Sequence, residues 1–535
     1  MLTFKHIIRN MQSMVNERAT HIVRMLLTLV LAICVAFAAI TAIRGNILFH
    51  TDIARDLLLI ENIVENQKLT LLGPRAGGIP GIFHGPLWLY INLPFYLLGN
   101  GDPSIIGMGW FVLWMVSLCF VWYASLRITS ESFIALVVVT WYALLTFSWT
   151  INYLNPSGAY LVVPLWFASL VLYHRFTRLR YIMSSYFLLG IIIQFQMALG
   201  APLVVLTTFI LMEQIIRNKK WLHITSVLAI TPFLLTFIVF ELRHDFLQTN
   251  STIRYVFGEV THGKSTEPLV SFMRERLVSS GRELIQMLAR GALTYSVILI
   301  LIGFALGRHS IQISVKKLNI KDLLPDYVWF ALYVWVGYWI VTLPYKGVMW
   351  GYYFGPLLPV VVIGFVGFLM HVFRTRVVFI VAICIFLMFP FGWLTSIWKS
   401  QLVASMSMGD WAFVEYKLEQ TLFASDAPKE FGYYVFTRDQ LGYSQLYALQ
   451  YLGRKHQGFT LHPLTKQKVT YLLVETEPHH VANSDYWRKE QVGISRPSDK
   501  VYNISRYFQI ERYDLSEDEM EVPSDPHLNQ NLIFR

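Results

Sequence analysis

The stretch that decides the fold is the apolar run "MLLTLVLAICVAFAAITAI" at residues 25–43, which is followed at 49–56 by the charged segment "FHTDIARD". A helix of this length crosses the hydrocarbon core of a bilayer. The run is longer than the core of a typical signal peptide, and no convincing small-residue cleavage site follows it. We therefore expect a retained membrane span, with acidic and basic residues directly at the membrane surface.

The composition of the whole chain is that of a polytopic membrane protein. Of its 535 residues, 55% are hydrophobic and only 15% are charged, and the mean hydropathy is +0.47. Soluble globular proteins carry much more charge. The net charge of +10 does not predict a nucleic-acid partner, because many Lys and Arg residues lie in short gaps between apolar runs. Cys34, Cys119 and Cys384 all lie inside such runs, which argues against a disulfide framework and a thiolate metal site.

Apolar runs of about 17–25 residues recur along the chain and predict about eleven membrane helices. Two of these runs are divided only by Gly200 and Pro202, so their separation is the least distinct. The predicted spans are 25–43, 104–125, 132–150, 157–173, 181–199, 201–216, 222–240, 291–306, 327–343, 352–370 and 377–396.

Basic residues between the spans predict the orientation of the chain. The gaps "HRFTRLR", "RNKK" and "HVFRTR" fall on the same side as the basic amino terminus, whereas "NYLNPS", "GAP" and "LPYKGVMW" on the other side contain one Lys and no Arg. We therefore expect a multi-pass protein of the cell (plasma or inner) membrane with a cytoplasmic amino terminus. Residues 44–103, a loop at about 241–290 and everything after about 397 would lie outside.

The chain after the last predicted span has the pattern of a small α/β domain. The segments "YYVFTRD", "VTYLLVETEP" and "RYFQIERYDL" read as strands, and "LGYSQLYALQYLGRK" has helical spacing. The predicted organisation is a membrane domain at 1–397, with a first outer loop at 44–103, followed by an extracytoplasmic α/β domain at 398–535.

Asp52, Arg55 and Asp56 form the first candidate site. In a helix these residues share one face, at positions i, i+3 and i+4, and the "LLLIENIVENQKL" that follows continues an amphipathic pattern typical of a helix on the membrane surface. Asp52 beside a cationic arginine fits a general base that stays ionised. An interfacial ion pair that caps and orients the helix is the structural alternative.

The second candidate is the segment "GPRAGGIPGIFHGPLWLYINLPFYLLG" at 73–99. Its density of Gly and Pro is incompatible with one continuous helix and predicts a tight loop on the membrane surface. Arg75 and His84 would project from this loop. Glycines let the backbone approach a bulky ligand, and an arginine can bind phosphate oxygens with two hydrogen bonds. A re-entrant turn whose histidine caps a neighbouring carbonyl is the alternative.

The third candidate is "TLPYKGVMWGYYFGPLLPVV" at 342–361. Lys346 is the one basic residue in the short outer gaps, so we expect either contact with a lipid-linked phosphate or snorkelling to headgroups. Tyr345, Tyr352 and Tyr353 would line an apolar groove or belong to the aromatic belt of the membrane interface.

Two further polar features have structural interpretations. Gln194 and Gln196 lie within a predicted span, where interhelical hydrogen bonds are the favoured role. The outer loop that begins at Glu241 is long and polar, which fits a mobile lid, although solvated charge is the simpler account.

Several nucleotide and metal motifs are absent from the sequence. It contains no P-loop, no G-x-G-x-x-G, no G-x-S-x-G and no H-E-x-x-H motif. No DxD-like pair follows the first span, so the sequence requires no cofactor, and a divalent metal is possible but unsupported.

The segments "TDIARD", "GIFHGPLWLY" and "GYYFGPLLPVV" resemble motifs of the GT-C glycosyltransferases. Within that group the chain is similar to the protein O-mannosyltransferase superfamily, including the bacterial lipid A aminoarabinose transferases, over about residues 20–400. Many relatives have an Asp-Glu pair at the first motif, whereas this chain has Asp52 followed by Ile53. It also has Gly351 where an arginine often precedes the aromatic residue.

The resemblance implies a membrane glycosyltransferase that moves a sugar, hexose or pentose, from a polyprenyl-phosphate donor to a lipid, glycan or protein acceptor, with inversion. By motif position Asp52 would be the catalytic base, and Arg55 would organise it or contact the donor. His84 would lie in the loop that closes the site, and Lys346 would correspond to the basic residue near the donor phosphate. The substrate-binding set would comprise Arg55, Asp56, Arg75, His84, Tyr345, Lys346, Tyr352 and Tyr353.

Two other classes of membrane protein handle the same lipid intermediates. A transporter or flippase would have charged residues in paired, broken helices at the bilayer midplane, whereas here the ionisable residues cluster at one boundary. An O-antigen ligase or polymerase would concentrate its catalytic residues in a large late outer loop. The position of the charged residues favours the transferase.

Overall fold

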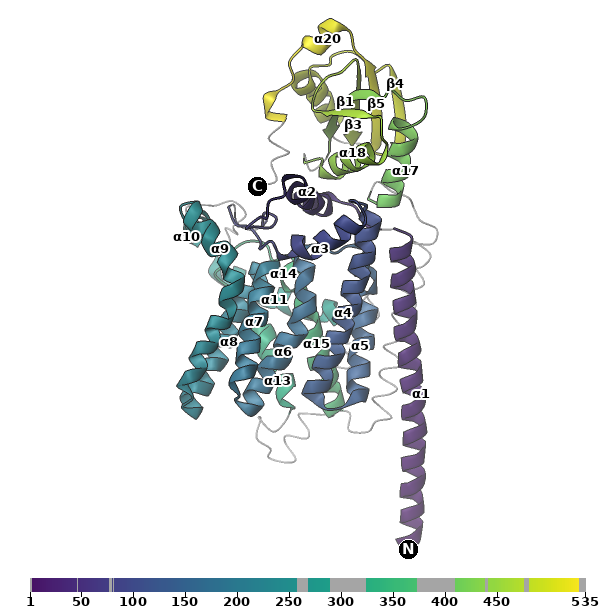
Figure 1. Ribbon diagram of the computed structural model, residues 1–535. Coiled ribbons are helices and arrows are strands. Elements are labelled where there is room, and N and C mark those ends of the chain that lie inside the picture. The colour runs from purple at the N-terminus through teal and green to yellow at the C-terminus, as the bar shows by residue number, and fades with distance from the viewer. Residues whose placement is uncertain are drawn as a thin grey trace.

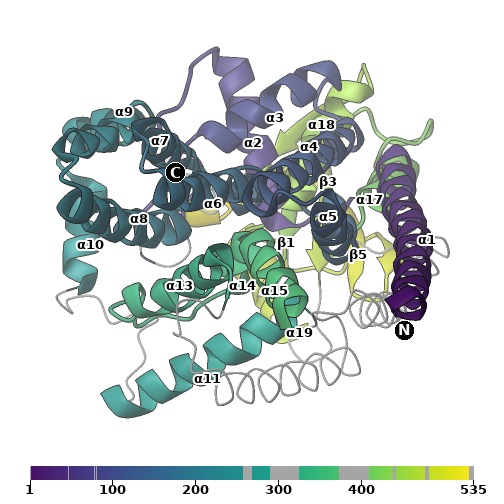
Figure 2. The same ribbon diagram turned by 90° about the horizontal axis from the view of Figure 1, so that it is seen from below.

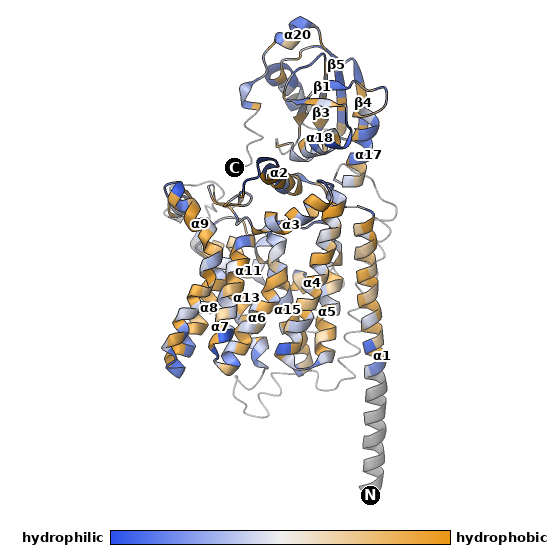
Figure 3. Ribbon diagram, in the orientation of Figure 1, coloured by the Kyte–Doolittle hydropathy of each residue, from blue (hydrophilic) through white to orange (hydrophobic). Residues whose placement is uncertain are grey.

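The computed structural model describes residues 2–45, 47–76, 79, 81–256, 268–288, 324–372, 409–437, 441–475 and 481–528. A helical bundle forms the body of the protein, and a small sheet domain lies at one end of it (Figure 1). The bundle is rich in apolar residues along its length, whereas the sheet domain mixes polar and apolar ones (Figure 3). This distribution is that expected for a bundle in a membrane and a domain in water.

The bundle consists of helices that run along its length, with α1 at its side (Figures 1 and 2). Its helices are α1 (Leu2–Ile43), α4 (Pro103–Thr129), α5 (Ser132–Thr146) with η1 (Phe147–Ile151), η2 (Asn155–Gly158) with α6 (Ala159–Phe176), α7 (Leu179–Phe195), α8 (Met197–Asn218), η3 (Trp221–Ile230) with α9 (Thr231–Arg243), α13 (Asp326–Val341), and α14 (Gly351–Phe354) with η5 (Gly355–Leu357) and α15 (Leu358–Val372).

Seven helices in the described part of the chain are long and apolar enough to cross a membrane. They are Thr20–Ile43, Pro103–Thr129, Ser132–Thr150, Asn155–Phe176, Met197–Asn218, Trp221–Arg243 and Gly351–His371. The shorter apolar helices Leu179–Phe195 and Asp326–Val341 coincide with two more predicted spans. The spans predicted at 291–306 and 377–396 lie outside the described residues. The chain is thus a multi-pass helical membrane protein.

Both ends of α4 carry favourable caps. The Asp102 carboxylate accepts a hydrogen bond from Ser104 N at 2.8 Å, and Pro103 occupies the first position of α4. An aspartate cap and a proline at this position are both favourable, because the first backbone N–H groups of a helix lack partners within it. At the other end Ser130 adopts a left-handed conformation that terminates α4.

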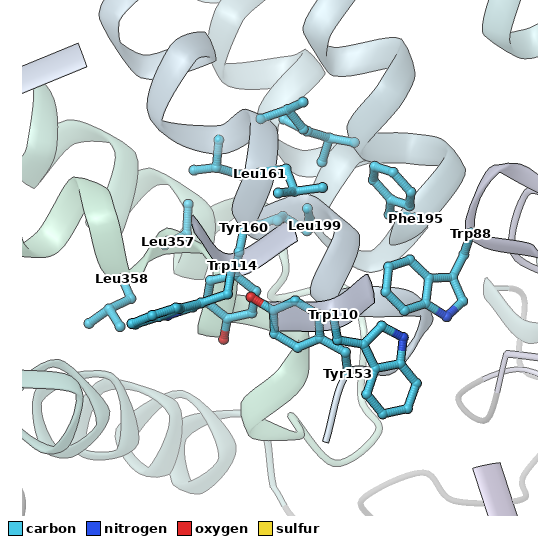
Figure 4. Close-up of a cluster of buried hydrophobic side chains, with 14 of the residues drawn as sticks. Trp88, Trp110, Trp114, Tyr153, Tyr160, Leu161, Phe195, Leu199, Leu357 and Leu358 are labelled. Atoms are coloured by element: carbon cyan, nitrogen blue, oxygen red, sulfur yellow. The ribbon is translucent and has the colours of Figure 1, made fainter. Parts of the chain in front are cut away.

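Large aromatic side chains fill the bundle at the end that faces the sheet domain (Figure 4). Trp110 Nε1 donates to Asn92 Oδ1 at 2.8 Å, and Trp114 Nε1 donates to Thr146 Oγ1 at 2.9 Å. Each indole N–H therefore has a partner, which matters in a membrane interior that offers no water. The packing holds the loops of this end on a rigid base.

The break between α7 and α8 differs from the prediction. Gly200 and Pro202 lie inside α8, and the extended residue that separates the helices is Gln196. Pro202 has no N–H to donate to the carbonyl of Ala198, and the Tyr338 hydroxyl donates to that oxygen instead, at 3.3 Å. The helix tolerates the proline because a neighbouring helix supplies the missing donor.

A layer of shorter helices covers the end of the bundle that faces the sheet domain. It comprises α2 (Thr51–Asn66), α3 (Leu87–Leu98) and α10 (Leu247–Val256). The longer α11 (Leu269–Leu288) packs against α13 and α15. Figure 1 shows α2 lying between the bundle and the sheet domain. The predicted helix after the first span is therefore confirmed. It is covered on both sides, by the bundle and by the sheet domain.

The sheet domain has five strands in the order β2-β1-β3-β5-β4. β1 is parallel to β2 and β3, whereas β5 is antiparallel to β3 and β4. The predicted strands and helix correspond to β1 (Glu430–Phe436), β3 (Val469–Glu475), β5 (Phe508–Asp514) and α18 (Tyr443–Lys455). Sequence reasoning missed β2 (Thr460–Pro463) and β4 (Lys500–Ser505); the other helices are α17 (Trp411–Leu422), α19 (Val481–Tyr486), a π-helix (Trp487–Val492) and α20 (Glu517–Glu521).

The sheet domain is docked onto α2 and the segment before it. Arg454 of α18 forms an ion pair with Glu61 of α2, whose side chain is buried. Phe49 packs against Trp411 with a ring distance of 4.8 Å, and the Tyr447 hydroxyl donates to the carbonyl of Gly101. The predicted domain boundary at 397/398 lies outside the described residues. The described sheet domain contacts α2, the segment before it and the connection between α3 and α4.

Candidate active site

Arg55 stands between two carboxylates at the start of α2. Its Nη1 donates to Asp52 Oδ1 at 2.8 Å, and its Nη2 and Nε donate to Asp56 Oδ1 at 2.9 and 3.1 Å. The Asp52 side chain is 52% exposed, whereas that of Asp56 is 6% exposed. The guanidinium therefore fixes Asp52 from one side and leaves that carboxylate accessible.

His50 fixes the first turn of α2. Its Nδ1 accepts a hydrogen bond from Asp52 N at 3.3 Å, so Nε2 carries the proton and donates to Asn152 Oδ1 at 2.9 Å. These two bonds connect the start of α2 to the loop before α6. The backbone of Asp52 is thereby held against the end of the bundle.

Burial shapes the charge of the site. Burial raises the pKa of Asp56 to about 6, against the opposing attraction of Arg55. Burial, assisted by Arg55, lowers the pKa of His84 to about 3, so this imidazole is neutral at physiological pH. Of the two carboxylates bound by Arg55, that of Asp56 is buried and that of Asp52 is exposed.

The Gly/Pro-rich segment folds back on itself as a short two-stranded ladder. Gly73 N donates to the carbonyl of His84 at 2.8 Å, and His84 N donates to the carbonyl of Pro74 at 3.0 Å. Arg75 pairs with Phe83 across the same ladder. The segment is therefore the tight loop that the sequence predicts.

The loop reaches the bundle at one glycine. Gly85 N donates to the carbonyl of Gln194 at 2.9 Å. A Cβ atom at this position would lie 2.2 Å from Gln194 Oε1, so only glycine permits the approach. The contact places His84 beside the end of α7.

One cavity of about 580 Å³ collects these elements. Its volume lies in the range of small-molecule sites. Asp52, Arg55 and Arg75 line its polar end, and apolar residues of α8 and α13 line the rest. The lining residues are Asp52, Arg55, Arg75, Ala76, Ile79, Ile82, His84, Leu154, Asn155, Pro156, Gln196, Met197, Ala198, Ala201, Pro202, Val205, Thr252, Tyr255, Tyr338, Val341, Thr342, Pro344, Tyr345, Met349, Tyr352 and Tyr353.

The apolar part of the cavity lies on the surface of a membrane helix. Met197, Ala201 and Val205 share one face of α8 at intervals of four residues, which extends about 12 Å along the helix axis. Ala201 and Val205 are also exposed on the outside of the bundle. A long apolar chain can therefore reach the cavity from the side of the bundle.

An aromatic segment forms another part of the cavity wall. Tyr345, Tyr352 and Tyr353 line the cavity, and the rings of Tyr352 and Tyr353 meet edge to face at 4.8 Å. Nη2 of Arg276 in α11 donates to the carbonyls of Tyr345 and Gly347. This arginine braces the loop that carries the tyrosines.

The nine site residues predicted from the sequence divide into two groups. Two of them do not line the cavity: Asp56 is buried behind Arg55, and Lys346 is exposed next to Tyr345. The other seven line the same cavity, namely Asp52, Arg55, Arg75, His84, Tyr345, Tyr352 and Tyr353. Arg75 forms no ion pair or hydrogen bond through its side chain within the described residues, so it is the cation open to a ligand.

Several polar residues of the site were not predicted. Asn155, Gln196 and Tyr338 line the cavity, and Arg276 supports it from behind. The sequence does contain a signal for Asn155, because it lies in the polar gap "NYLNPS" between two spans. The predicted interhelical bonds are confirmed: Gln194 donates to Phe233 O and Thr236 Oγ1.

Polar side chains elsewhere have structural roles. Glu241 accepts hydrogen bonds from Gln248 N, Thr249 N and Thr249 Oγ1, and so caps the start of α10. In the ranges that the structure describes, no three His, Cys, Asp or Glu side chains come together as a metal-binding group.

Fold and cavity together define a multi-pass membrane protein with an acid–arginine site between its bundle and a small sheet domain. Two solved structures align with most of the chain. ArnT from Cupriavidus metallidurans bound to undecaprenyl phosphate is 13% identical, with 92% of this chain and 98% of that chain covered and a TM-score of 0.43. The apo state of the same protein is 12% identical, with 91% and 97% covered and a TM-score of 0.42.

No protein-family model matches the chain, and no curated protein matches it significantly. The aligned structures are distant in sequence, so we base the assignments that follow on the contacts within this chain.

Proposed function

We propose that the protein is a membrane glycosyltransferase of the GT-C type that uses a polyprenyl-phosphate sugar as donor. One observation carries the proposal: a single cavity contains an accessible carboxylate held by an arginine, a second arginine whose side chain has no partner among the described residues, and an apolar wall on a membrane helix. A sugar linked through phosphate to a long isoprenoid needs these three environments side by side.

The donor fits the cavity in one direction. The isoprenoid chain would lie along Met197, Ala201 and Val205 of α8 and enter from the side of the bundle. Its phosphate would pair with Arg75, because the guanidinium of Arg55 already serves two carboxylates. Arg75 is thus better placed for the phosphate than Lys346, which lies outside the cavity lining.

Asp52 would act as the general base. It takes the proton from an acceptor hydroxyl while that oxygen attacks the anomeric carbon of the sugar. The bond between the anomeric carbon and the phosphate oxygen breaks, and the electron pair leaves with the lipid phosphate. Displacement in one step inverts the anomeric configuration, and positive charge at Arg75 stabilises the leaving group.

The acceptor would approach from the side of the sheet domain, which is the polar end of the cavity. The basic gaps of the sequence favour placing this side outside the cell membrane, with the amino terminus in the cytoplasm. The acceptor is then a lipid, glycan or protein of the outer face, and the transferred sugar is a hexose or a pentose.

Sugar transfer by purified protein tests the proposal. The protein in lipid nanodiscs is incubated with a panel of polyprenyl-phosphate sugars, and release of polyprenyl phosphate is measured. We expect release by the wild-type chain and at least a hundredfold slower release by Asp52→Asn, since general-base catalysis contributes about 10²–10⁴ in rate.

Glu65→Gln is the matched control, because Glu65 is exposed on the same helix and does not line the cavity. Near-normal release by a folded Asp52→Asn variant, or equal losses in the two variants, would remove the base assignment. Folding of each variant is checked by thermal unfolding.

A further inference from the structure

Three polar side chains around the break between α7 and α8 each have one buried atom without a hydrogen-bond partner among the described residues. Asn155 Oδ1, Gln196 Oε1 and His84 Nδ1 are buried and form no hydrogen bond within the described part of the chain. All three residues line the cavity. A buried polar atom without a partner costs about 1–3 kcal/mol, so three of them in one cavity wall indicate a place for a ligand.

Hydrogen bonds bring the three residues together around the break. Asn155 Nδ2 donates to the carbonyl of Phe195, the residue before Gln196. Gly85, the residue after His84, donates to the carbonyl of Gln194. The loop before α6, the Gly/Pro-rich loop and the helix break therefore meet at one point of the wall.

Both amides have a defined orientation. Asn155 Nδ2 and Gln196 Nε2 each donate to a backbone carbonyl, of Phe195 and of Tyr352. A carbonyl can only accept, so the nitrogen and oxygen of each amide cannot be exchanged. The atoms left over are thus two oxygens, which accept hydrogen bonds and cannot donate them.

We propose that this wall, defined as Asn155, Gln196 and His84, binds the sugar of the donor and selects a neutral sugar that presents hydroxyl groups. The inference rests on the proposed function. Hydroxyl groups donate to the two amide oxygens, and the neutral imidazole of His84 accepts or donates according to its tautomer. Arg75 at the polar end of the same cavity then remains for the phosphate.

A sugar carboxylate is the rival occupant of the wall. The amino terminus of α8 begins at Met197 and by itself favours an anion. A carboxylate at the wall would nevertheless face two acceptor oxygens with no proton between them, and it would lose its hydration. Sites that hydrogen-bond a substrate hydroxyl discriminate strongly against analogues that cannot reproduce the bond.

Lipid binding measures this selectivity without requiring turnover. Protein in nanodiscs is titrated with polyprenyl phosphate, with a polyprenyl-phosphate hexose, with its mono-deoxy analogues and with the corresponding uronate. We expect the wild-type chain to bind the hexose lipid at least about tenfold more tightly than the uronate. Gln196→Met should weaken binding of the hexose lipid about tenfold and leave binding of polyprenyl phosphate unchanged.

Gln214→Met is the matched control. Gln214 is also a buried glutamine of this region of the chain, but it lies at the other end of α8, hydrogen-bonded with Asn218. This variant should bind all lipids as the wild-type chain does. One mono-deoxy analogue should bind equally well to the wild-type chain and to Gln196→Met. This analogue lacks the hydroxyl that Gln196 would accept from, so the substitution removes a hydrogen bond that the analogue does not form.

The outcomes separate the two proposals. If polyprenyl phosphate does not bind, the proposed function is overturned, and this inference falls with it. If polyprenyl phosphate binds but the hexose and uronate lipids bind equally well, only the sugar-selective wall is overturned. This comparison uses the wild-type chain, so it decides the matter even if Gln196→Met does not fold.

Discussion

At the scale of single residues, the shared guanidinium of Arg55 determines the chemistry of the site. Asp52 and Asp56 are both within hydrogen-bond distance of it, yet one is open and the other buried. Asp56 has a second oxygen without a partner. Because Asp56 is buried, its pKa is raised to about 6. A change in the charge of Asp56 alters how strongly Arg55 pairs with Asp52, since the guanidinium binds both carboxylates.

The pH dependence of transfer should report on Asp56. As pH falls through about 6, Asp56 takes up a proton, and Arg55 is left with Asp52 as its one anionic partner. The ion pair with Arg55 then competes more strongly with the acceptor hydroxyl for Asp52, so kcat/KM of the wild-type chain should fall below about pH 6. Asp56→Asn should lower kcat/KM at pH 7.5 roughly tenfold, because this factor corresponds to the free energy of about one charge-assisted hydrogen bond. The variant should also abolish the inflection in the pH profile of kcat/KM.

Stability provides an independent check with a defined sign. The folded pKa of Asp56 is raised above its ordinary value, so the folded state binds more protons between about pH 4 and 6, and ionised Asp56 lowers stability as pH rises through this window. Nearby Asp52 and His50 also act on it. The thermal midpoint of the wild-type chain should therefore fall relative to that of Asp56→Asn from pH 4 to 6. A constant difference between the two would contradict the assignment.

Sequence reasoning succeeded for these residues where spacing decides, and not where tertiary contacts decide. The i, i+3 spacing predicts the contact between Asp52 and Arg55, and the Gly/Pro-rich composition predicts the loop of Arg75 and His84. The burial of Asp56 depends on elements packed around α2. The position of Lys346 depends on how one loop turns. The sequence pattern alone cannot distinguish a lysine that lines the cavity from an exposed lysine next to a lining tyrosine.

At the scale of elements, α8 connects the membrane with the cavity. Its exposed face at Ala201 and Val205 is both part of the cavity lining and part of the outer surface of the bundle. Sequence reasoning placed the start of this helix at Gly200 and Pro202, because these residues are the usual helix breakers. The actual break lies at Gln196. The helix continues through Pro202 because the Tyr338 hydroxyl donates to the carbonyl of Ala198, which the proline leaves without a donor.

A large side chain at Val205 should obstruct entry of the isoprenoid chain. Val205→Trp is expected to raise the KM for a polyprenyl-phosphate sugar at least tenfold while kcat changes less, because the catalytic residues remain untouched. The measurement compares long-chain donors with short, water-soluble analogues, whose KM should change little.

Phe209→Trp is the control for Val205→Trp. Phe209 lies one turn further along the same face of α8, is 62% exposed and does not line the cavity. If both variants raise KM equally, or if short and long donors are affected alike, the chain does not enter along α8.

At the scale of the whole molecule, the sheet domain forms the upper support of the active-site helix. Glu61 is buried in α2 and pairs with Arg454 of α18, and Tyr443 of the same helix lies within electrostatic range of the Arg55 guanidinium. The alternating pattern of the strands made this domain predictable. Its contact with α2 was not, because both surfaces are ordinary amphipathic helices in sequence.

Breaking the ion pair should therefore impair catalysis at a distance. Arg454→Met leaves the Glu61 carboxylate buried without a partner, which costs about 3–5 kcal/mol of stability. We expect kcat to fall more than the donor KM rises, because the position of α2 is disturbed and the apolar wall is not. The double variant Arg454→Met/Glu61→Gln, which removes the buried charge, should recover part of the thermal stability.

Arg512→Gln serves as the comparison in the same domain. It breaks a more exposed ion pair with Asp514 within the sheet and should change neither kcat nor KM. Equal effects of Arg454→Met and Arg512→Gln on kcat would show that the domain does not position α2.

The pairing between the α1–α2 connection and the start of the sheet domain bears on how the protein is made. Phe49 N donates to the carbonyl of Gly409 at 2.8 Å, and Trp411 N donates to that of Ile47 at 3.1 Å. The helix that carries Asp52 leaves the ribosome before the bundle helices from α4 onward, whereas its docking partner leaves after the described bundle helices. A contact so distant in sequence closes slowly, and a nascent chain carries Asp52 through insertion of these helices before α2 is fixed. The proposed transfer would therefore begin only once the sheet domain has been made and has docked.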